Sequence, residues 1–277
     1  MSTHSTPAPD FPPEIQLNSP DGASAKISPY GAHVLSWIPA GGDEGLFLSP
    51  KAEFRSGAAI RGGVPVIFPQ FAGMGNLPKH GFARNLLWEV ARASADSATF
   101  WLSENADTHN LWPHRFLAEY KVQINASNLY MTLAITNIDV APFTFTAALH
   151  TYLRVADVRR ASVAGLSSLN FQDSANGGQE LRENADSLTF PGEVDRIYSD
   201  ALSPLQLVTE KQQILISAEG FPDAVLWNPG PEKCASLADM EPDGYLQFVC
   251  VEAAVIGQPV LLLPGQTWHG TQTLSAQ

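Results

Sequence analysis

The feature that most constrains the possible fold of this chain is a series of short runs in which apolar and polar residues alternate. Gly, Pro, Asn and Asp separate these runs. A period of two places every second side chain on one face of a β-strand. Two such faces consist of Leu129, Met131, Leu133 and Ile135, and of Phe143, Phe145, Ala147, Leu149 and Leu153. Long runs with helical periodicity are missing. The pattern therefore predicts an all-β protein, a large antiparallel β-sandwich of two packed sheets.

The predicted strands cover most of the chain. Early ones lie in SAKISPYGAHVLSWIPAGGDE, FLAEYKVQI, LYMTLAITN and FTFTAALHTYLRV, and a late group lies in VLWNP, LQFVCVEAAVI and PVLLLPGQTWHGTQTLSA, the last pair joined through Pro264-Gly265. Residues 1–13, MSTHSTPAPDFPP, contain too little apolar surface to offset the entropy of ordering, which predicts a disordered tail. Residues 14–277 are predicted to form a single domain, because all-β units of this length commonly share one core.

Composition narrows the class of function. The net charge is −12, from 28 Asp and Glu against 16 Lys and Arg, which disfavours binding to nucleic acid or to an anionic membrane. Cys234 and Cys250 have neither metal-ligand spacing nor the density of a secreted disulfide scaffold. Neither a signal peptide nor a spanning helix is indicated, so a cytoplasmic protein is predicted. No motif demands a cofactor or a metal ion, and the sequence is silent on oligomeric state, with a monomer favoured.

His150 is the first candidate for chemistry. Period two places it on the polar face of its strand with Thr146 and Tyr152, opposite Phe145 and Leu149. An imidazole exchanges a proton near neutral pH, so one interpretation is a general acid. The other is a strand histidine whose ring is satisfied by a neighbouring hydroxyl group.

Glu252 interrupts the apolar run FVCVEAAVI. Burying an unpaired charge costs several kcal/mol, so a carboxylate in such a strand needs a partner or a purpose. An ion pair with an arginine, or an edge strand facing water, would explain it. A general base is the alternative, because burial and nearby dipoles tune the pKa of a carboxyl group.

Two arginines bracket the segment RGGVPVIFPQFAGMGNLPKHGFAR, residues 61–84. Its glycines allow the backbone to approach a ligand closely, and Arg61, Lys79 and Arg84 can neutralise an anion. Arginine suits phosphate oxygens especially well. The alternative is that these cations face water or pair with some of the many acidic residues.

Asp195 lies in GEVDRIYSD, after a Pro-Gly turn. Its carboxylate could accept hydrogen bonds from vicinal hydroxyl groups or orient a histidine. A surface salt bridge to the neighbouring Arg196 would be equally consistent with the sequence.

Eight ordered blocks resemble one family: IRGGVPVIFPQF, LPKHGFAR, LWPHRF, LHTYLRV, DRIY, WNPG…DM, FVCVEAA and LLPGQTWHGTQTL. From about residue 25 onward the chain is similar to the hexose-6-phosphate mutarotases, or glucose-6-phosphate 1-epimerases, of the aldose 1-epimerase superfamily. The resemblance implies a galactose-mutarotase-like β-sandwich with a catalytic histidine at His150 and a catalytic glutamate at Glu252. It also implies that substrate is bound by Arg61, Lys79, His80, Arg84 and Asp195. Lys79 departs from the family pattern, which commonly has Gln there, so it either strengthens phosphate binding or signals a different anionic sugar.

The resemblance implies a cofactor-independent exchange of sugar anomers. Glu252 would take the proton of the C1 hydroxyl, His150 would protonate the ring oxygen, and Arg61, Lys79 and Arg84 would hold the 6-phosphate of a small sugar phosphate. Two alternatives stay open. A glycoside hydrolase would use Glu252 and Asp195 as its two carboxyl groups, and a non-catalytic protein would only bind the sugar phosphate.

Overall fold

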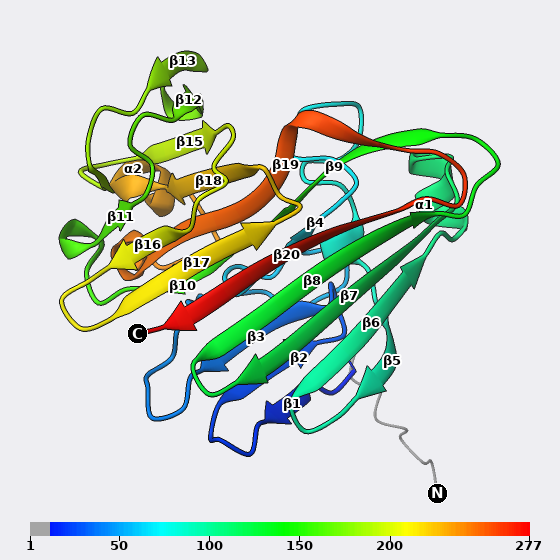
Figure 1. The fold of residues 1–277 in the computed structure, drawn as a ribbon, viewed down its shortest axis with the longest axis horizontal. Helices are drawn as coiled ribbons and strands as arrows, with labels where there is room; N and C mark the ends of the chain where they lie inside the picture. Colours follow the sequence, from blue (N-terminus) through cyan, green and yellow to red (C-terminus); the bar gives the residue numbers. More distant parts are fainter. Residues whose placement is uncertain (1–11) are drawn as a thin grey trace, which may run out of the picture.

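A computed structural model describes residues 12–277 as three antiparallel β-sheets (Figure 1). Of the predicted disordered tail, residues 1–11 lie outside the described residues. A small sheet contains β1 (Ile15–Asn18), β2 (Ser24–Ser28) and β3 (His33–Ile38). The nine-stranded sheet has the order β14 (Ser187–Thr189), β11 (Ser162–Ala164), β16 (Leu205–Val208), β17 (Gln213–Glu219), β20 (Thr267–Ala276), β8 (Asn128–Asn137), β7 (Phe116–Asn125), β6 (Ser97–Ser103) and β5 (Glu89–Ala93). The eight-stranded sheet has the order β13 (Gln179–Arg182), β12 (Asn170–Asp173), β15 (Val194–Tyr198), β18 (Asp223–Asn228), β19 (Phe248–Leu262), β9 (Phe143–Leu149) and β4 (Val66–Ile67), with β10 (Tyr152–Arg154) also paired to β19.

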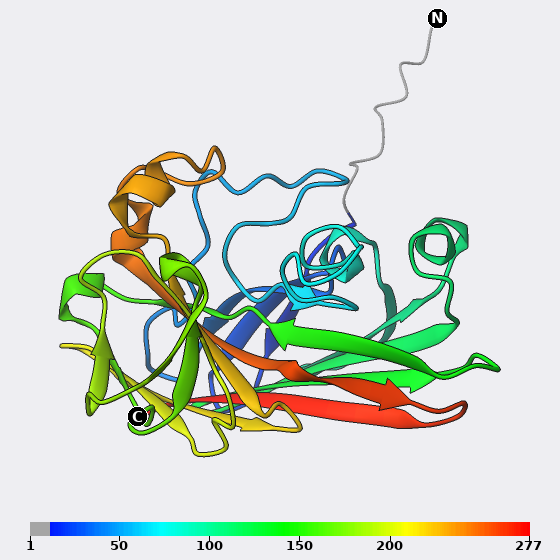
Figure 2. The same ribbon diagram turned by 90° about the horizontal axis from the view of Figure 1, so that it is seen from above.

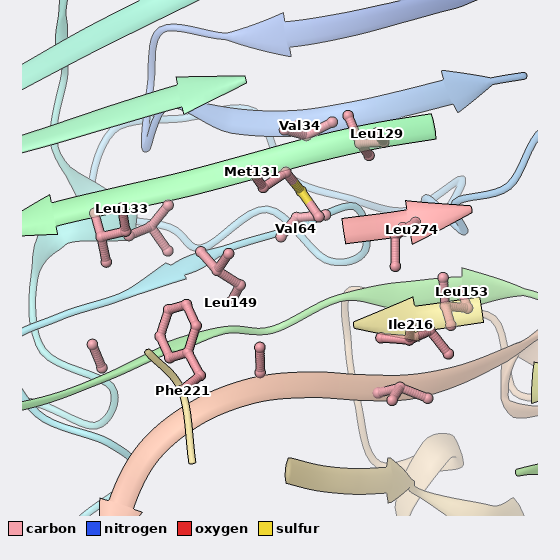
Figure 3. Close-up of a cluster of buried hydrophobic side chains, with 14 of the residues drawn as sticks. Val34, Val64, Leu129, Met131, Leu133, Leu149, Leu153, Ile216, Phe221 and Leu274 are labelled. Carbon is pink, nitrogen blue, oxygen red and sulfur yellow. The ribbon is translucent and has the colours of Figure 1, made fainter. Parts of the chain in front are cut away.

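The two large sheets enclose the main apolar core. Figure 2 shows the orange-red strand β19 lying over the red strand β20 of the other sheet. Figure 3 shows Leu129, Met131 and Leu133 projecting from β8 into a space that also receives Leu149 and Phe221. Every residue of the two predicted apolar faces is buried. The predicted antiparallel β-sandwich is therefore confirmed, while the small third sheet was not foreseen.

The outer face of the eight-stranded sheet is partly covered as well. Strand β19 is central there, with β18 on one side and β9 and β10 on the other. Alternation along β19 directs Val251 and Ala253 into the main core and leaves Glu252 and Ala254 on the outer face. A second apolar cluster, to which Ala254 and Phe71 belong, lies on this outer face.

The segment between Arg61 and Arg84 covers part of this outer face as an ordered loop. Its one strand is β4, Val66–Ile67, which pairs with β9. Gly81 has a φ of +66°, and a Cβ atom there would lie 2.2 Å from the carbonyl oxygen of Phe68. A residue with a side chain would therefore push the loop away from the sheet.

Helices are few and short. The α-helices are α1 (Ala106–Leu111) and α2 (Gly230–Ala235), and the 3-10 helices are η1 (Ala83–Asn85), η2 (Val158–Arg160), η3 (Ser174–Asn176) and η4 (Gly244–Gln247). Figure 1 shows α2 close to the strands β15 and β18. Within residues 12–277, no helix has the length and apolar character needed to cross a membrane.

Candidate active site

His150 and Glu252 form a buried pair. His150 Nε2 lies 3.3 Å from Glu252 Oε1, and the two residues are 8% and 2% exposed. Burial raises the pKa of Glu252 well above its ordinary value, and nearby Asp195 adds to this effect. Burial also lowers the pKa of His150 well below its ordinary value, helped by the positive charges of Arg84 and Arg61. The pair can thus share one proton, so that one group donates while the other accepts.

Local structure fixes the imidazole of His150. The residue lies at the break between β9 and β10, where its backbone N–H donates to the carbonyl of Pro65 at 3.0 Å. The ring stacks on Tyr152 with centroids 4.9 Å apart and meets the edge of Trp227 at 5.8 Å. Because its close polar partner is a carboxylate, the interpretation of a ring satisfied by a hydroxyl group is wrong.

Glu252 lies in the middle of the eight-stranded sheet, directly opposite Val225 of β18. The edge-strand interpretation is therefore wrong, and its ion-pair partner is His150 and not an arginine. Glu252 Oε2 and His150 Nδ1 are buried and have no hydrogen-bond partner within residues 12–277. Buried polar atoms are rarely left unsatisfied, so both atoms are available to bond a molecule that enters the site.

A cavity of about 280 Å³ lies above this pair. It brings together all seven residues singled out from the sequence, which are Arg61, Lys79, His80, Arg84, His150, Asp195 and Glu252. The segment 61–84 supplies four of them, and the strands of the eight-stranded sheet and their connections supply the others. Within residues 12–277, no three His, Cys, Asp or Glu side chains gather so as to hold a metal ion.

The cations of the cavity differ in how they are held. Arg61 Nε donates to Asp239 Oδ2 at 3.1 Å, and its Nη1 donates to the hydroxyl of Tyr152 at 3.1 Å. Arg84 Nη2 donates to the carbonyl of Lys79 at 3.1 Å, and its buried Nε has no partner among the described residues. Lys79 is exposed and forms no ion pair with a described carboxylate. The interpretation that these cations pair with acidic residues therefore holds only for Arg61.

His80 contacts the ring of His150, with centroids 5.8 Å apart. Its Nδ1 accepts a long hydrogen bond of 3.3 Å from the backbone N–H of Ala72. Burial, and then the charge of Arg84, lower the pKa of His80 to about 3. The ring is therefore neutral near pH 7 and adds no positive charge beside His150.

Asp195 reaches the cavity from β15, where it is paired with Trp227 of β18. Burial raises its pKa, an effect that the charge of Lys233 opposes. The neighbouring Arg196 instead bonds Glu183 at 2.9 Å. The proposed Asp195–Arg196 salt bridge is therefore wrong.

Other residues of the cavity were not among the predicted site residues, namely Phe71, Ala72, Met74, Tyr152, Ser174, Ile197, Val225, Trp227, Lys233 and Leu237. Period two had placed Tyr152 on the face of His150 without assigning it to the site, and the WNPG block contains Trp227. A larger surface cavity of about 390 Å³ lies elsewhere, beside the β16–β17 turn. It contains none of the seven predicted residues, and its Arg160 and Glu210 pair with each other at 2.8 Å.

Comparison with known proteins agrees with this architecture. The sequence model of the aldose 1-epimerase family matches residues 13–275. A candidate glucose-6-phosphate 1-epimerase of Cenchrus ciliaris is 35% identical over 95% of this chain and 84% of its own length. The crystal structure of a candidate mutarotase of Salmonella typhimurium, YeaD, is 32% identical, with a TM-score of 0.87 over 95% of this chain and 90% of that one.

The fold extends to more distant proteins. A galactose mutarotase related enzyme of Lactobacillus acidophilus has a TM-score of 0.76 over 95% of this chain and 97% of its own, at 16% identity. The predicted galactose-mutarotase-like fold and the predicted isomerase class are confirmed. The family match and the extended similarity to the Cenchrus protein show that this chain belongs to the aldose 1-epimerase family.

Proposed function

We propose that this protein interconverts the α and β anomers of a hexose 6-phosphate, with glucose 6-phosphate as the first candidate. The observation that carries the proposal is the buried His150–Glu252 pair at a cavity that also presents Lys79 and Arg84. The name of the Cenchrus relative, a candidate glucose-6-phosphate 1-epimerase, supports the choice of substrate.

The chemistry needs one acid and one base. Glu252 takes the proton of the C1 hydroxyl, the C1–O5 bond breaks as a carbonyl forms at C1, and His150 gives a proton to O5. Rotation about C1–C2 presents the other face of the aldehyde, and ring closure returns both protons. For this direction the carboxylate must begin ionised and the imidazole protonated. Burial disfavours both charges, so this state must form in the substrate complex, where the closeness of the two groups lets their charges attract each other.

The cations supply orientation. Arg84 and Lys79 form no ion pair with a carboxylate among the described residues, so a phosphate dianion could pair with both cations. Arg61, held by Asp239 and Tyr152, presents its remaining N–H groups in a fixed direction. Binding energy from the non-reacting phosphate then positions C1 and O5 against the catalytic pair. Asp195 accepts hydrogen bonds from sugar hydroxyl groups.

NMR exchange spectroscopy of glucose 6-phosphate, glucose and galactose tests the proposal on wild type and Glu252→Gln. The expected result is fast exchange of the phosphorylated sugar that is lost in the variant. Exchange no faster than in buffer for all three sugars would overturn the catalytic roles of His150 and Glu252. Equal exchange of all three would retain the chemistry and remove the role of the phosphate.

A further inference from the structure

An ion pair at the cavity has no part in the proton transfers. Lys233 Nζ lies 2.6 Å from Glu193 Oε1, and the two side chains are 41% and 34% exposed. Lys233 lines the cavity, whereas Glu193 does not. The ammonium group therefore lies between solvent, an acidic partner outside the cavity and the interior of the cavity.

Rigid backbone places both partners of this pair. Lys233 belongs to α2, which begins at Gly230 directly after β18, and Glu193 precedes β15. Gly230 has a φ of +62°, and a Cβ atom there would lie 2.6 Å from the backbone nitrogen of Glu193. Asn228 fixes this junction by accepting from the N–H of Gly230 at 2.9 Å. The two side chains can thus separate while their backbones stay in place.

The charges of the cavity favour such a separation. Arg61 already has a carboxylate partner in Asp239. The partner of Lys233 is a partly exposed carboxylate, and ion pairs of this kind contribute little to stability. A phosphate group carries up to two negative charges and three acceptor oxygens, whereas Glu193 carries one charge, so the phosphate attracts the ammonium group more strongly. Exchange of Glu193 for a phosphate is therefore favourable once a phosphorylated sugar occupies the cavity.

We propose that Lys233 is a further substrate-binding residue: its ammonium group separates from Glu193 and binds the phosphate group of the sugar. Glu193 competes with the phosphate for this ammonium group and so limits the affinity of the protein for the sugar phosphate. This inference rests on the proposed function and names a binding group of the same site. It makes the two members of one ion pair act in opposite directions on the same ligand.

Opposite substitutions test this arrangement. Lys233→Met is expected to weaken binding of glucose 6-phosphate about tenfold more than binding of glucose, the size of one charged hydrogen bond. Glu193→Gln is expected to tighten binding of glucose 6-phosphate by roughly two- to threefold, because the competitor is gone. Lys233→Arg keeps a cation and should restore most of the affinity. Calorimetric titration with glucose 6-phosphate, glucose and inorganic phosphate measures all of these directly.

A matched control removes the same charge elsewhere. Lys51 pairs with Glu241 at 3.4 Å, with both side chains similarly exposed, and it does not line the cavity. Lys51→Met should leave the affinity for glucose 6-phosphate unchanged, and a loss equal to that of Lys233→Met would reduce the effect to net charge and overturn the inference. The inference would also be overturned if Lys233→Met and Glu193→Gln changed the affinity for glucose 6-phosphate in the same direction, or if neither variant changed it.

Exchange measurements on the same samples separate the two proposals. One outcome is that the two variants change the affinity for glucose 6-phosphate in opposite directions while wild type does not accelerate anomer exchange. That outcome would overturn the proposed function and support the role of Lys233. Accelerated exchange without those changes in affinity would support the function and overturn the role of Lys233.

Discussion

His150 Nε2 and Glu252 Oε1 lie 3.3 Å apart across two neighbouring strand segments, with both side chains buried on the outer face of the eight-stranded sheet. The second ring nitrogen of His150, Nδ1, and the second carboxyl oxygen of Glu252, Oε2, have no hydrogen-bond partner within the described part of the chain. This arrangement leaves the second polar atom of each group available to a substrate.

Replacing His150 by Gln should lower the rate of anomer exchange by about 10² to 10⁴, the usual contribution of one general acid. His114 offers a matched control, because its Nδ1 lies 3.9 Å from Asp139 Oδ2, outside the cavity. His114→Gln should exchange glucose 6-phosphate at the wild-type rate in the same NMR measurement. Retained activity in His150→Gln would remove the assigned acid.

Arg84→Ala should raise the KM for glucose 6-phosphate by about tenfold or more, and the KM for glucose by much less, because a partly buried charged donor to the phosphate is lost. Arg55→Ala is the control, since Arg55 pairs with Glu53 and does not line the cavity. Steady-state anomer exchange at a series of sugar concentrations measures both constants. Equal losses for the two sugars would place Arg84 elsewhere on the substrate.

Glu252→Gln should have a larger free energy of unfolding than wild type at pH 8, and the difference between the two should be smaller at pH 5. The pKa of Glu252 is raised in the folded state, so its favourable contribution is complete below the unfolded-state value of about 4.5 and is lost as pH rises through the folded-state pKa. Between these two pKa values wild type loses up to about 1.4 kcal/mol per pH unit relative to the variant. Denaturant unfolding at several pH values measures the difference. A variant less stable than wild type at pH 8 would show that the pairing with His150 outweighs burial.

Gly81→Ala should lower the free energy of unfolding by about 2 kcal/mol or more, because the position has a left-handed φ and a Cβ atom would clash with the carbonyl of Phe68. Gly73 lies in the same loop, has no such φ, and a Cβ atom there would meet nothing within 4 Å. Gly73→Ala should therefore be neutral. Chemical denaturation compares the two, and equal stability of both variants would mean that the loop is not held against the sheet at Phe68.

The sequence predicted those features that depend on neighbours along the chain. Period two identified the buried faces of β8 and β9 and placed His150 opposite the core. Glu252 was recognisable because a charged residue inside an apolar strand conflicts with burial. Both signals are local, and each needs only a few consecutive residues.

Features that depend on distant segments could not be predicted in this way. The partner of Arg61 is Asp239, and Lys233 reaches the cavity from a helix that carries no apolar periodicity. The runs FVCVEAAVI and PVLL form one long strand, β19, whose register shifts between Val255 and Val260. Such contacts follow from sheet order and register, which alternation alone does not specify.

Strand β20 pairs with β8 on one side and β17 on the other, so that Ser275 lies opposite Asn128. During synthesis on the ribosome, the two halves of the nine-stranded sheet must therefore wait for Thr267–Ala276 to emerge before they can join. Until then β8 and β17 each present an unpaired edge of backbone N–H and C=O groups, a template for pairing with other chains. The nascent protein is thus vulnerable to aggregation for as long as Thr267–Ala276 has not emerged, and a chaperone that shields these two edges would act during that interval.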